Sequence, residues 1–213
     1  MDPKDIVRNG YDAVSRAYRG NTEDREGIEA YHRWLDELLP LLSPGTPVLD
    51  LGCGCGIPVA RRLAATHHVT GVDISPVQIQ RARDLVPDGR FLCADMSALD
   101  FPPASFGAIV SFYAIIHVPL AEQPRLFRNL RRWLVPGGYL MATVGSDGWT
   151  GTERDWLSVP GATMYWSHAD AATYEDWLVE NGFVIHWTRF IPEGDGGHTL
   201  ILAQTQARCV QLK

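Results

Sequence analysis

The chain has 213 residues, 46% of them hydrophobic and 21% charged, which is the composition of an ordinary globular protein. Its 19 basic and 25 acidic residues give a net charge of −6, the wrong sign for a protein whose main partner is nucleic acid. No stretch approaches the roughly 20 apolar residues of a membrane helix, and charges stand where a secretory signal would be apolar. We therefore expect a cytoplasmic protein without a membrane partner.

The cysteines and the absence of repeats bear on domain organisation. Cys53, Cys55, Cys93 and Cys209 form neither an even disulfide framework nor a CxxC pair. Reduced thiols are expected, and no metal site. Without internal repeats or a Pro/Gly/Ser-rich linker, one domain over residues 1–213 is predicted.

Short β-like runs alternate with amphipathic helical windows along the chain. Strands are predicted at 48–51, 68–72, 90–94, 108–113, 139–144, 183–190 and 199–205. Helices are predicted at 58–66, 77–86, 124–134 and 171–181, after a helical segment that covers residues 1–42.

The strands are mostly continuous apolar runs, such as AIVSFY, which is typical of a parallel sheet covered by helices on both faces. The last two differ, because only IPEGDGGH (191–198) joins them. That is too short for a parallel crossover, so these two strands are predicted to pair antiparallel.

The strongest motif is VLDLGCGCG (48–56), which is followed directly by a predicted helix. Glycines at a strand end let the backbone turn sharply and approach a ligand, and the helix N-terminus offers unpaired N–H groups. A dinucleotide fingerprint requires a third small residue at Ile57 or Val59, depending on the frame. Both positions carry branched side chains, so another nucleotide-like ligand is indicated.

Four motifs in order resemble those of the class I S-adenosylmethionine-dependent methyltransferases: VLDLGCGCG, GVDIS (71–75), CADM (93–96) and WLVPGGYL (133–140). The resemblance covers residues 48–144, and more loosely extends to 205. It implies an α/β fold, a Rossmann-like three-layer α/β/α sandwich. Its sheet would have seven mostly parallel strands with the last one antiparallel, preceded by the N-terminal helical segment. It also implies S-adenosylmethionine as cofactor and S-adenosylhomocysteine as product.

The resemblance assigns cofactor contacts to the strand ends. Asp73 stands where a carboxylate can accept from both ribose hydroxyls, although it could instead be a turn residue before a helix. Asp95 would accept from the adenine amino group, or could merely cap the residues after it. The remaining expected cofactor contacts are Tyr18, Asp50, Gly52, Gly54, Gly56, Ile74, Met96 and Ser111. For Tyr18, a packing role in the helical stripe with Tyr11 and Val14 is equally open.

Methyl transfer needs orientation more than dedicated catalytic groups, but a hydroxyl or amine acceptor must lose a proton. His117, after the fourth strand, is the first candidate base, and His168 is the second. Either histidine could instead be structural. No metal-ligand cluster is evident, which indicates a metal-independent reaction.

The segment 145–168 carries Trp149, Trp156, Tyr165 and Trp166 but shows little periodicity. We predict that it faces the acceptor, with Tyr113, Tyr165 and Trp166 as contacts; a subdomain that packs for its own sake is the alternative. The N/D-P-P-Y/F motif of amino-group methyltransferases is absent at 111–114. This departure argues against nucleobase or protein-amide methylation.

The sequence thus predicts a methyltransferase that acts on O, N or C of a small organic acceptor, and specialised metabolism is one setting for such a reaction. Two alternatives remain open. One is an enzyme on the same scaffold that uses the bound sulfonium for a cyclisation or decarboxylation. The other is a non-catalytic regulatory protein that binds S-adenosylmethionine. Neither the acceptor nor the oligomeric state can be read from the sequence.

Overall fold

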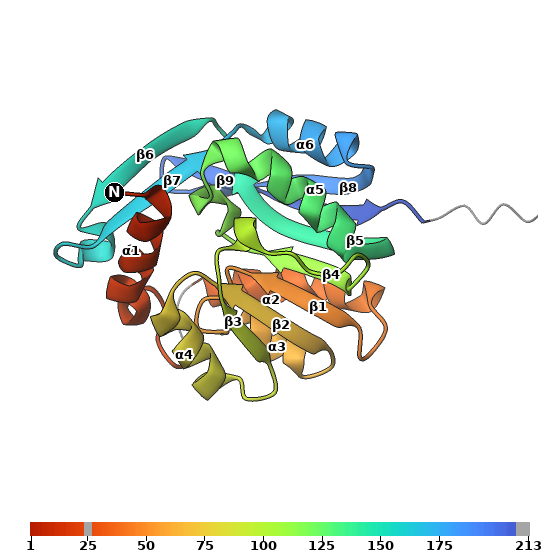
Figure 1. The fold of residues 1–213 in the computed structure, drawn as a ribbon, viewed down its shortest axis with the longest axis horizontal. Helices are drawn as coiled ribbons and strands as arrows, with labels where there is room; N and C mark the ends of the chain where they lie inside the picture. Colours follow the sequence, from red (N-terminus) through yellow and green to blue (C-terminus); the bar gives the residue numbers. More distant parts are fainter. Residues whose placement is uncertain (24–26, 208–213) are drawn as a thin grey trace, which may run out of the picture.

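A seven-stranded sheet forms the centre of the computed structural model, which describes residues 1–23 and 27–207. The strand order is β3-β2-β1-β4-β5-β9-β8. Neighbours from β3 to β5 pair in parallel, whereas β9 is antiparallel to both β5 and β8. The predicted seven-stranded, mostly parallel Rossmann-like sheet is confirmed (Figure 1).

The strands are β1 (Pro47–Leu51), β2 (His68–Asp73), β3 (Arg90–Cys93), β4 (Phe106–Ser111), β5 (Leu134–Gly145), β6 (Trp149–Arg154), β7 (Thr163–His168), β8 (Phe183–Glu193) and β9 (Gly196–Thr205). The α-helices are α1 (Pro3–Tyr18), α2 (Ile28–Leu38), α3 (Val59–Ala64), α4 (Pro76–Leu85), α5 (Gln123–Trp133) and α6 (Ala171–Glu180). Short 3-10 turns follow several of these elements, among them η2 (Met96–Ala98), η3 (Ile115–His117) and η5 (Trp156–Ser158).

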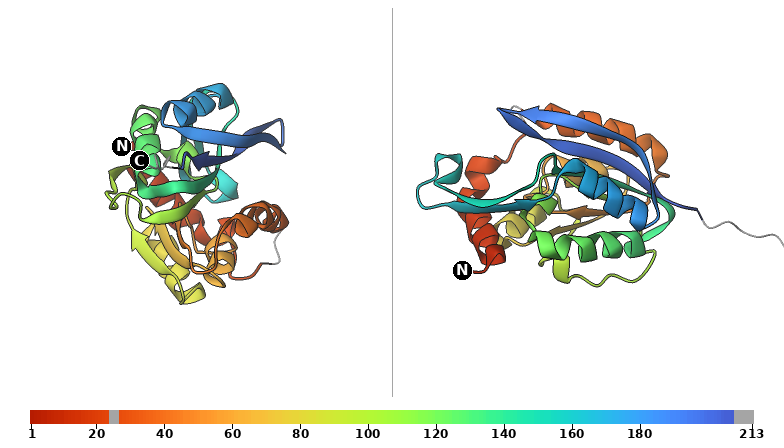
Figure 2. Two further views of the ribbon diagram at one scale, coloured as in Figure 1. Left: turned by 90° about the vertical axis from the view of Figure 1, so that its right-hand side faces the viewer. Right: turned by 90° about the horizontal axis from the view of Figure 1, so that it is seen from above.

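Helices cover the two faces of the sheet in separate layers. Apolar residues of α2, α3 and α4 pack with one set of strand side chains, including Val48 and Val110. Those of α5 and α6 pack with the alternate set, including Leu49 and Ile109. Because successive strand residues point to opposite faces, each strand contributes to both cores. The views in Figure 2 show these layers from two further directions.

Helix ends follow the local signals in the sequence. The Ser75 hydroxyl accepts from the N–H of Gln78 and so caps α4, with Pro76 in its first turn. Gly182 follows α6 with φ +76°, as a glycine after a helix end commonly does. These two boundaries were predicted. Helix α3, however, begins at Val59 and ends at Ala64, and is shorter than expected.

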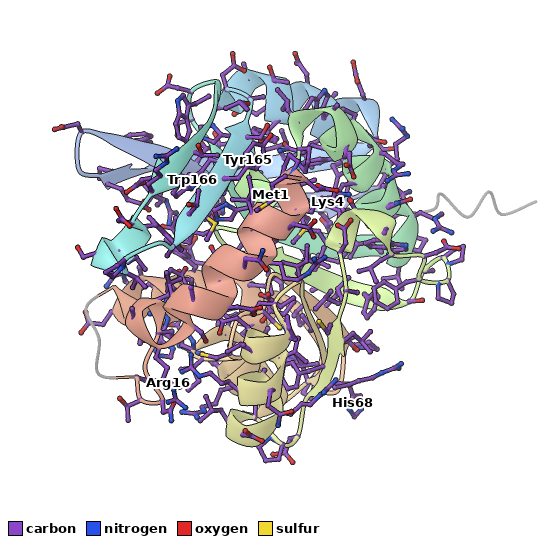
Figure 3. The ribbon with its side chains drawn as sticks, turned by 60° about the vertical axis from the view of Figure 1, so that its left-hand side comes forward. Met1, Lys4, Arg16, His68, Tyr165 and Trp166 are labelled. Atoms are coloured by element: carbon purple, nitrogen blue, oxygen red, sulfur yellow. The ribbon has the colours of Figure 1, made fainter. Side chains whose placement is uncertain are left out.

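A helix and a hairpin cover the carboxyl ends of the strands. The N-terminal helical segment consists of two helices, of which α1 crosses the strand ends while α2 lies on the sheet face. The segment 145–168, which showed no clear period, contains the antiparallel hairpin β6–β7. A side chain at Gly10 of α1 would lie 2.5 Å from the carbonyl oxygen of Thr163, so backbone meets backbone there. Figure 3 shows α1 beside the strand that carries Tyr165 and Trp166.

Three of the cysteines, Cys53, Cys55 and Cys93, are free thiols, whereas Cys209 lies outside the described residues. Within residues 1–23 and 27–207, no helix is both long and apolar enough to span a membrane. The same ranges contain no group of three or more His, Cys, Asp or Glu side chains positioned to hold a metal ion.

Candidate active site

The glycine loop after β1 leaves space for a ligand. Gly52 and Gly54 have φ values of +75° and +53°, which favour glycine. A side chain at Gly52 would collide with Ala114, whereas one at Gly54 would project into open space. The open space at Gly54 is where a ligand can lie against the backbone. Gly56, by contrast, packs closely against Val86 and lets the loop approach α4.

Asp73 ends β2 beside this loop and is 8% exposed. Its two carboxylate oxygens accept from the N–H groups of Gly54 and Ser75, each at 2.9 Å. Burial raises the pKa of Asp73 to about 6, although these N–H groups act in the opposite direction. The carboxylate is therefore held in a fixed orientation with lone pairs left to accept from a ligand.

Asp50 is a buried carboxyl group with an unpartnered oxygen. It is 2% exposed, and its Oδ2 has no hydrogen-bond partner among the described residues. Burial, and next the charge of Asp73, raises the pKa of Asp50 to about 8. An unsatisfied buried acceptor is costly. A cationic donor, such as the ammonium of an amino acid, would satisfy it.

Arg19, directly after α1, lines the same hollow of about 400 Å³ as Asp50 and Gly54. Its guanidinium lies 5.4 Å from the ring centre of Tyr18 and 5.2 Å from that of Tyr31. A buried carboxyl and a buried guanidinium in one hollow match the two ends of an amino-acid zwitterion. The residues present thus fit the methionine part of S-adenosylmethionine.

Asp95 follows β3 and takes part in an ionic network. Its carboxylate accepts from the Lys4 ammonium at 2.7 Å and from the N–H of Ser97 at 2.9 Å. Lys4 also contacts Glu122 at 2.7 Å. Despite burial, which alone would raise it, the pKa of Asp95 is lowered by the hydrogen bonds from Lys4 and Ser97. Asp95 therefore does cap η2, and it also ties the start of α1 to the site.

A cavity of about 660 Å³, here called the cofactor cavity, opens between α1 and the ends of β1, β2, β3 and β4. Asp73, Ile74, Asp95 and Met96, which the sequence analysis assigns to the adenosine of the cofactor, line it together with Gly52 and Gly54 of the glycine loop. The remaining lining includes Lys4, Val7, Phe112, Ala114 and Val118.

A second, wider hollow of about 1390 Å³, here called the acceptor cavity, lies beside it. Aromatic side chains dominate its walls: Tyr11, Tyr18, Tyr31, Trp34, Tyr113, Trp156 and Trp166. Four side chains line both cavities, namely Tyr11, Tyr18, Tyr113 and His117. The two cavities therefore meet at these four residues.

His117 is buried at this junction, and its tautomer can be deduced from its contacts. Nδ1 lies 2.6 Å from the carbonyl oxygen of Tyr165, which can only accept, so Nδ1 carries the proton. Nε2 then accepts from the Tyr11 hydroxyl at 2.9 Å. Burial lowers the pKa of His117 to about 4, so the ring is neutral at pH 7. In this pair, the proton of the Tyr11 hydroxyl can therefore shift to the unprotonated Nε2 of His117.

Tyr113 occupies an unusual backbone conformation, with φ +55°. Its N–H donates to the hydroxyl of Thr143 on β5, which holds the residue in this conformation. Left-handed backbone at a non-glycine residue is uncommon and costs about 1–3 kcal/mol. This backbone conformation places the Tyr113 ring where it lines both cavities.

Several predicted site residues lie elsewhere. The Ser111 hydroxyl donates to the carbonyl of Leu51, so it bridges two strands beneath the site. Tyr165 and His168 are not among the described residues that line the cavities above, and His168 contacts the carbonyl of Asp147. Tyr165 contributes through its backbone carbonyl, not its ring.

Among the charged and histidine side chains that line the cavities, four were not selected from the sequence: Lys4, Arg19, Glu193 and His198. Arg19 follows the tyrosine stripe of α1 directly, and this proximity was the one available signal. Glu193 and His198 lie on either side of the β8–β9 turn. Nothing local marks them, because the β8–β9 hairpin reaches the cavity through the pairing of β9 with β5, a strand much earlier in the chain.

Comparisons with known proteins agree with this geometry. A family model described as a methyltransferase domain matches residues 48–138. The 2-methyl-6-phytyl-1,4-hydroquinone methyltransferase of Synechocystis is 41% identical over 108 residues, which are 48% of this chain and 33% of that protein. The malonyl-[acyl-carrier protein] O-methyltransferase of Halorhodospira halophila is 30% identical over 196 residues, 86% of this chain and 65% of that protein. The chain thus spans less than two thirds of the length of these relatives.

Among solved structures, the magnesium protoporphyrin IX methyltransferase of Synechocystis with bound S-adenosylhomocysteine has a TM-score of 0.71. It is 21% identical, and the match covers 96% of this chain and all of that one. Residues 48–138 belong to the methyltransferase domain family, and the fold of the chain is that of the class I S-adenosylmethionine-dependent methyltransferases. The cofactor of this family is S-adenosylmethionine, which matches the donor set around Asp50, Asp73 and the glycine loop.

Proposed function

We propose that this protein transfers the methyl group of S-adenosylmethionine to an oxygen, nitrogen or carbon of a small acceptor in the acceptor cavity. The observation that carries the proposal is the junction, where Tyr11, Tyr18, Tyr113 and His117 line both cavities. A donor in one cavity and an acceptor in the other would meet there.

Each end of the cofactor has matching groups in the proposed arrangement. Asp73 would accept from the ribose hydroxyls, and Ile74 and Met96 would flank the adenine. Asp50 and Arg19 would hold the ammonium and carboxylate of the methionine part. Asp95 would accept from the adenine amino group with a lone pair that Lys4 and Ser97 leave free.

When bound, the cofactor supplies an electrophilic methyl on a good leaving group, so the protein has to orient the acceptor and exclude water. The aromatic walls serve both tasks. For a hydroxyl or amine acceptor, the Tyr11 hydroxyl would accept the acceptor's proton while its own proton moves to Nε2 of His117. The His117 ring is unprotonated at neutral pH because burial lowers its pKa. Burial also raises the pKa of Tyr11, so the two protons would move together.

The test is a mass-spectrometric screen of small acceptors with S-adenosylmethionine that carries an isotopically labelled methyl group. We expect one or more products that gain the labelled methyl, with an equal amount of S-adenosylhomocysteine. The D73A variant should form less product at limiting cofactor.

Other results would contradict the proposal in distinct ways. Acceptor turnover without cofactor consumption would identify a cyclase- or decarboxylase-type enzyme. Tight cofactor binding without turnover of any acceptor would identify a regulatory protein.

A further inference from the structure

The wall of the acceptor cavity consists largely of aromatic side chains, which favour some small molecules over others. Rings from α1, α2, β7, η5 and the segment after β4 surround it. Among them, Trp156 contacts both Tyr11 and Trp166, at ring-centre distances of 5.5 and 5.6 Å. Aromatic faces and edges interact best with another planar π-system or with a polarised donor. A saturated ring of the same size would fill the space without these contacts.

One carboxylate faces this aromatic space. Among the residues that the structure describes, Glu193 is the only acidic side chain that lines the acceptor cavity. It stands at the mouth, with 42% of its side chain exposed. Its carboxylate lies 3.1 Å from Nδ1 of His198, and the Tyr113 hydroxyl also bonds to it.

These two partners keep Glu193 in place and ionised. The hydrogen bonds from His198 and Tyr113 lower the pKa of Glu193, although burial acts in the opposite direction. Tyr113 belongs to the junction, so Glu193 is one hydrogen bond away from the place where the cavities meet. A ligand group that bonds to Glu193 would therefore fix the ring that lies between Glu193 and the junction.

Arg19, the arginine that lines the acceptor cavity, also lines a second hollow. It shares this hollow with Asp50 and stacks on Tyr18 and Tyr31, where the proposed function assigns it to the cofactor carboxylate. Once it is paired there, Glu193 remains as the charge that faces the acceptor. An anionic acceptor would be repelled, and a hydrogen-bond donor would be favoured.

We propose that the acceptor is a planar aromatic molecule that presents an O–H or N–H donor to Glu193 at the mouth of the acceptor cavity. This inference rests on the proposed methyl transfer, because only that reaction makes the bound molecule a methyl acceptor. The binding preference itself can be tested without any turnover.

The experiment compares three probes by ligand-observed NMR titration of the protein saturated with S-adenosylhomocysteine. 2-Naphthol is planar and carries a donor. 2-Naphthoate is planar but anionic, and decahydro-2-naphthol carries the donor on a saturated ring. We expect 2-naphthol to bind at least fivefold more tightly than either of the other two.

Two variants assign the preference to named groups. E193Q should lose most of the discrimination against 2-naphthoate, whereas D195N removes the same charge from the same turn outside the cavity lining and should keep it. W156L should lose the preference for the planar ring, and W149L, which changes the exposed tryptophan of the hairpin, should keep it.

The inference is overturned if the three probes bind equally, or if E193Q and D195N behave alike. Failure of the methyl-transfer screen alone would leave these titrations intact, because they require only a bound product analogue. Conversely, methyl transfer with no selectivity among the probes would remove this inference and leave the proposed function standing.

Discussion

The cofactor cavity and the acceptor cavity share four side chains, yet they are made from different parts of the fold. The cofactor side consists of backbone and short acidic side chains at the ends of β1, β2 and β3. The acceptor side consists mainly of large rings from α1, α2, the β6–β7 hairpin and the segment after β4, with Glu193 and His198 added by β8 and β9. The first set is fixed by strand register and can hold one ligand rigidly. The second depends on side-chain packing, which can change without altering the sheet.

This contrast predicts that the strongest effect on turnover comes from the junction. In H117A the proton acceptor for Tyr11 is lost, and we expect kcat for a hydroxyl or amine acceptor to fall by about 100-fold or more. The Kd for the cofactor should stay unchanged. Steady-state kinetics and calorimetry measure the two quantities separately.

The matched control is H168A, because His168 is outside the described cavity linings. The pH profile adds a second check. Nε2 of His117 is free above its pKa of about 4 and protonated below it. The contribution of His117 to kcat should therefore be constant from pH 6 to 8 and disappear only in acid. An equal loss in H117A and H168A would contradict the assignment.

The cofactor side should respond in affinity instead of rate. D73A removes a carboxylate that is held in place by two backbone N–H groups. We expect cofactor binding to weaken by about 1–3 kcal/mol, while acceptor KM at saturating cofactor stays close to that of the wild type. Calorimetric titration gives the Kd, with D88A at an exposed position as the control. Unchanged affinity in D73A would remove Asp73 from the proposed ribose contacts.

Asp50 should make cofactor binding depend on pH. Its pKa is about 8 in the ligand-free protein, and a bound ammonium would favour the ionised form. Below pH 8 the carboxyl group must therefore lose a proton on binding. We expect affinity to rise about tenfold from pH 6.5 to 7.5, with release of nearly one proton. Calorimetry in buffers of different ionisation enthalpy measures this release.

D50N has no proton to lose at this position, so its weaker affinity should vary little over the same range. It should also stabilise the ligand-free protein. A carboxyl group whose pKa is raised from 3.8 costs stability as the pH rises toward 8. A gain of about 1 kcal/mol corresponds to roughly 2–4 °C in Tm. Wild-type binding without proton release would contradict this role.

The smallest effect is expected for a single ring of the acceptor wall. W166A should raise acceptor KM by about two- to tenfold, in line with about 0.5–1.5 kcal/mol for an aromatic contact, and should leave cofactor affinity unchanged. W149A, which changes a residue with 48% exposure, is the control. If W166A weakened the binding of cofactor and acceptor equally, Trp166 would be structural and the distinction between the two cavities would be lost.

The sequence predicted that the side chains of the cofactor side meet at the strand ends, and their contacts with the cofactor stay a prediction. Asp73, Ile74, Asp95 and Met96 reach one cavity through parallel pairing alone, and parallel strands present their carboxyl ends at one edge. The seven strands of the main sheet and their alternation with helices could also be predicted from the sequence. Apolar runs that are buried on both faces leave a clear pattern.

The acceptor side was predicted only in part. Tyr113 and Trp166 do line the acceptor cavity, but the hairpin that carries Trp166 gave no period because its strands β6 and β7 are largely exposed or half-buried. Glu193 enters the cavity because β9 pairs with β5, which places the β8–β9 turn beside the carboxyl end of β5. His117 was selected for its position after β4, yet its tautomer depends on a carbonyl 48 residues later. Such contacts between distant segments cannot be read from local spacing.

The close approach at Gly10 has a consequence for how this protein can diversify. Helix α1 contributes residues to both cavities, and at Gly10 it touches the Thr163 carbonyl with no side chain in between. A methyl group at that point would wedge the helix away from the hairpin and loosen both ligands together. New acceptors are therefore accommodated most simply by exchanging individual rings, with the spacing of helix and hairpin left as it is.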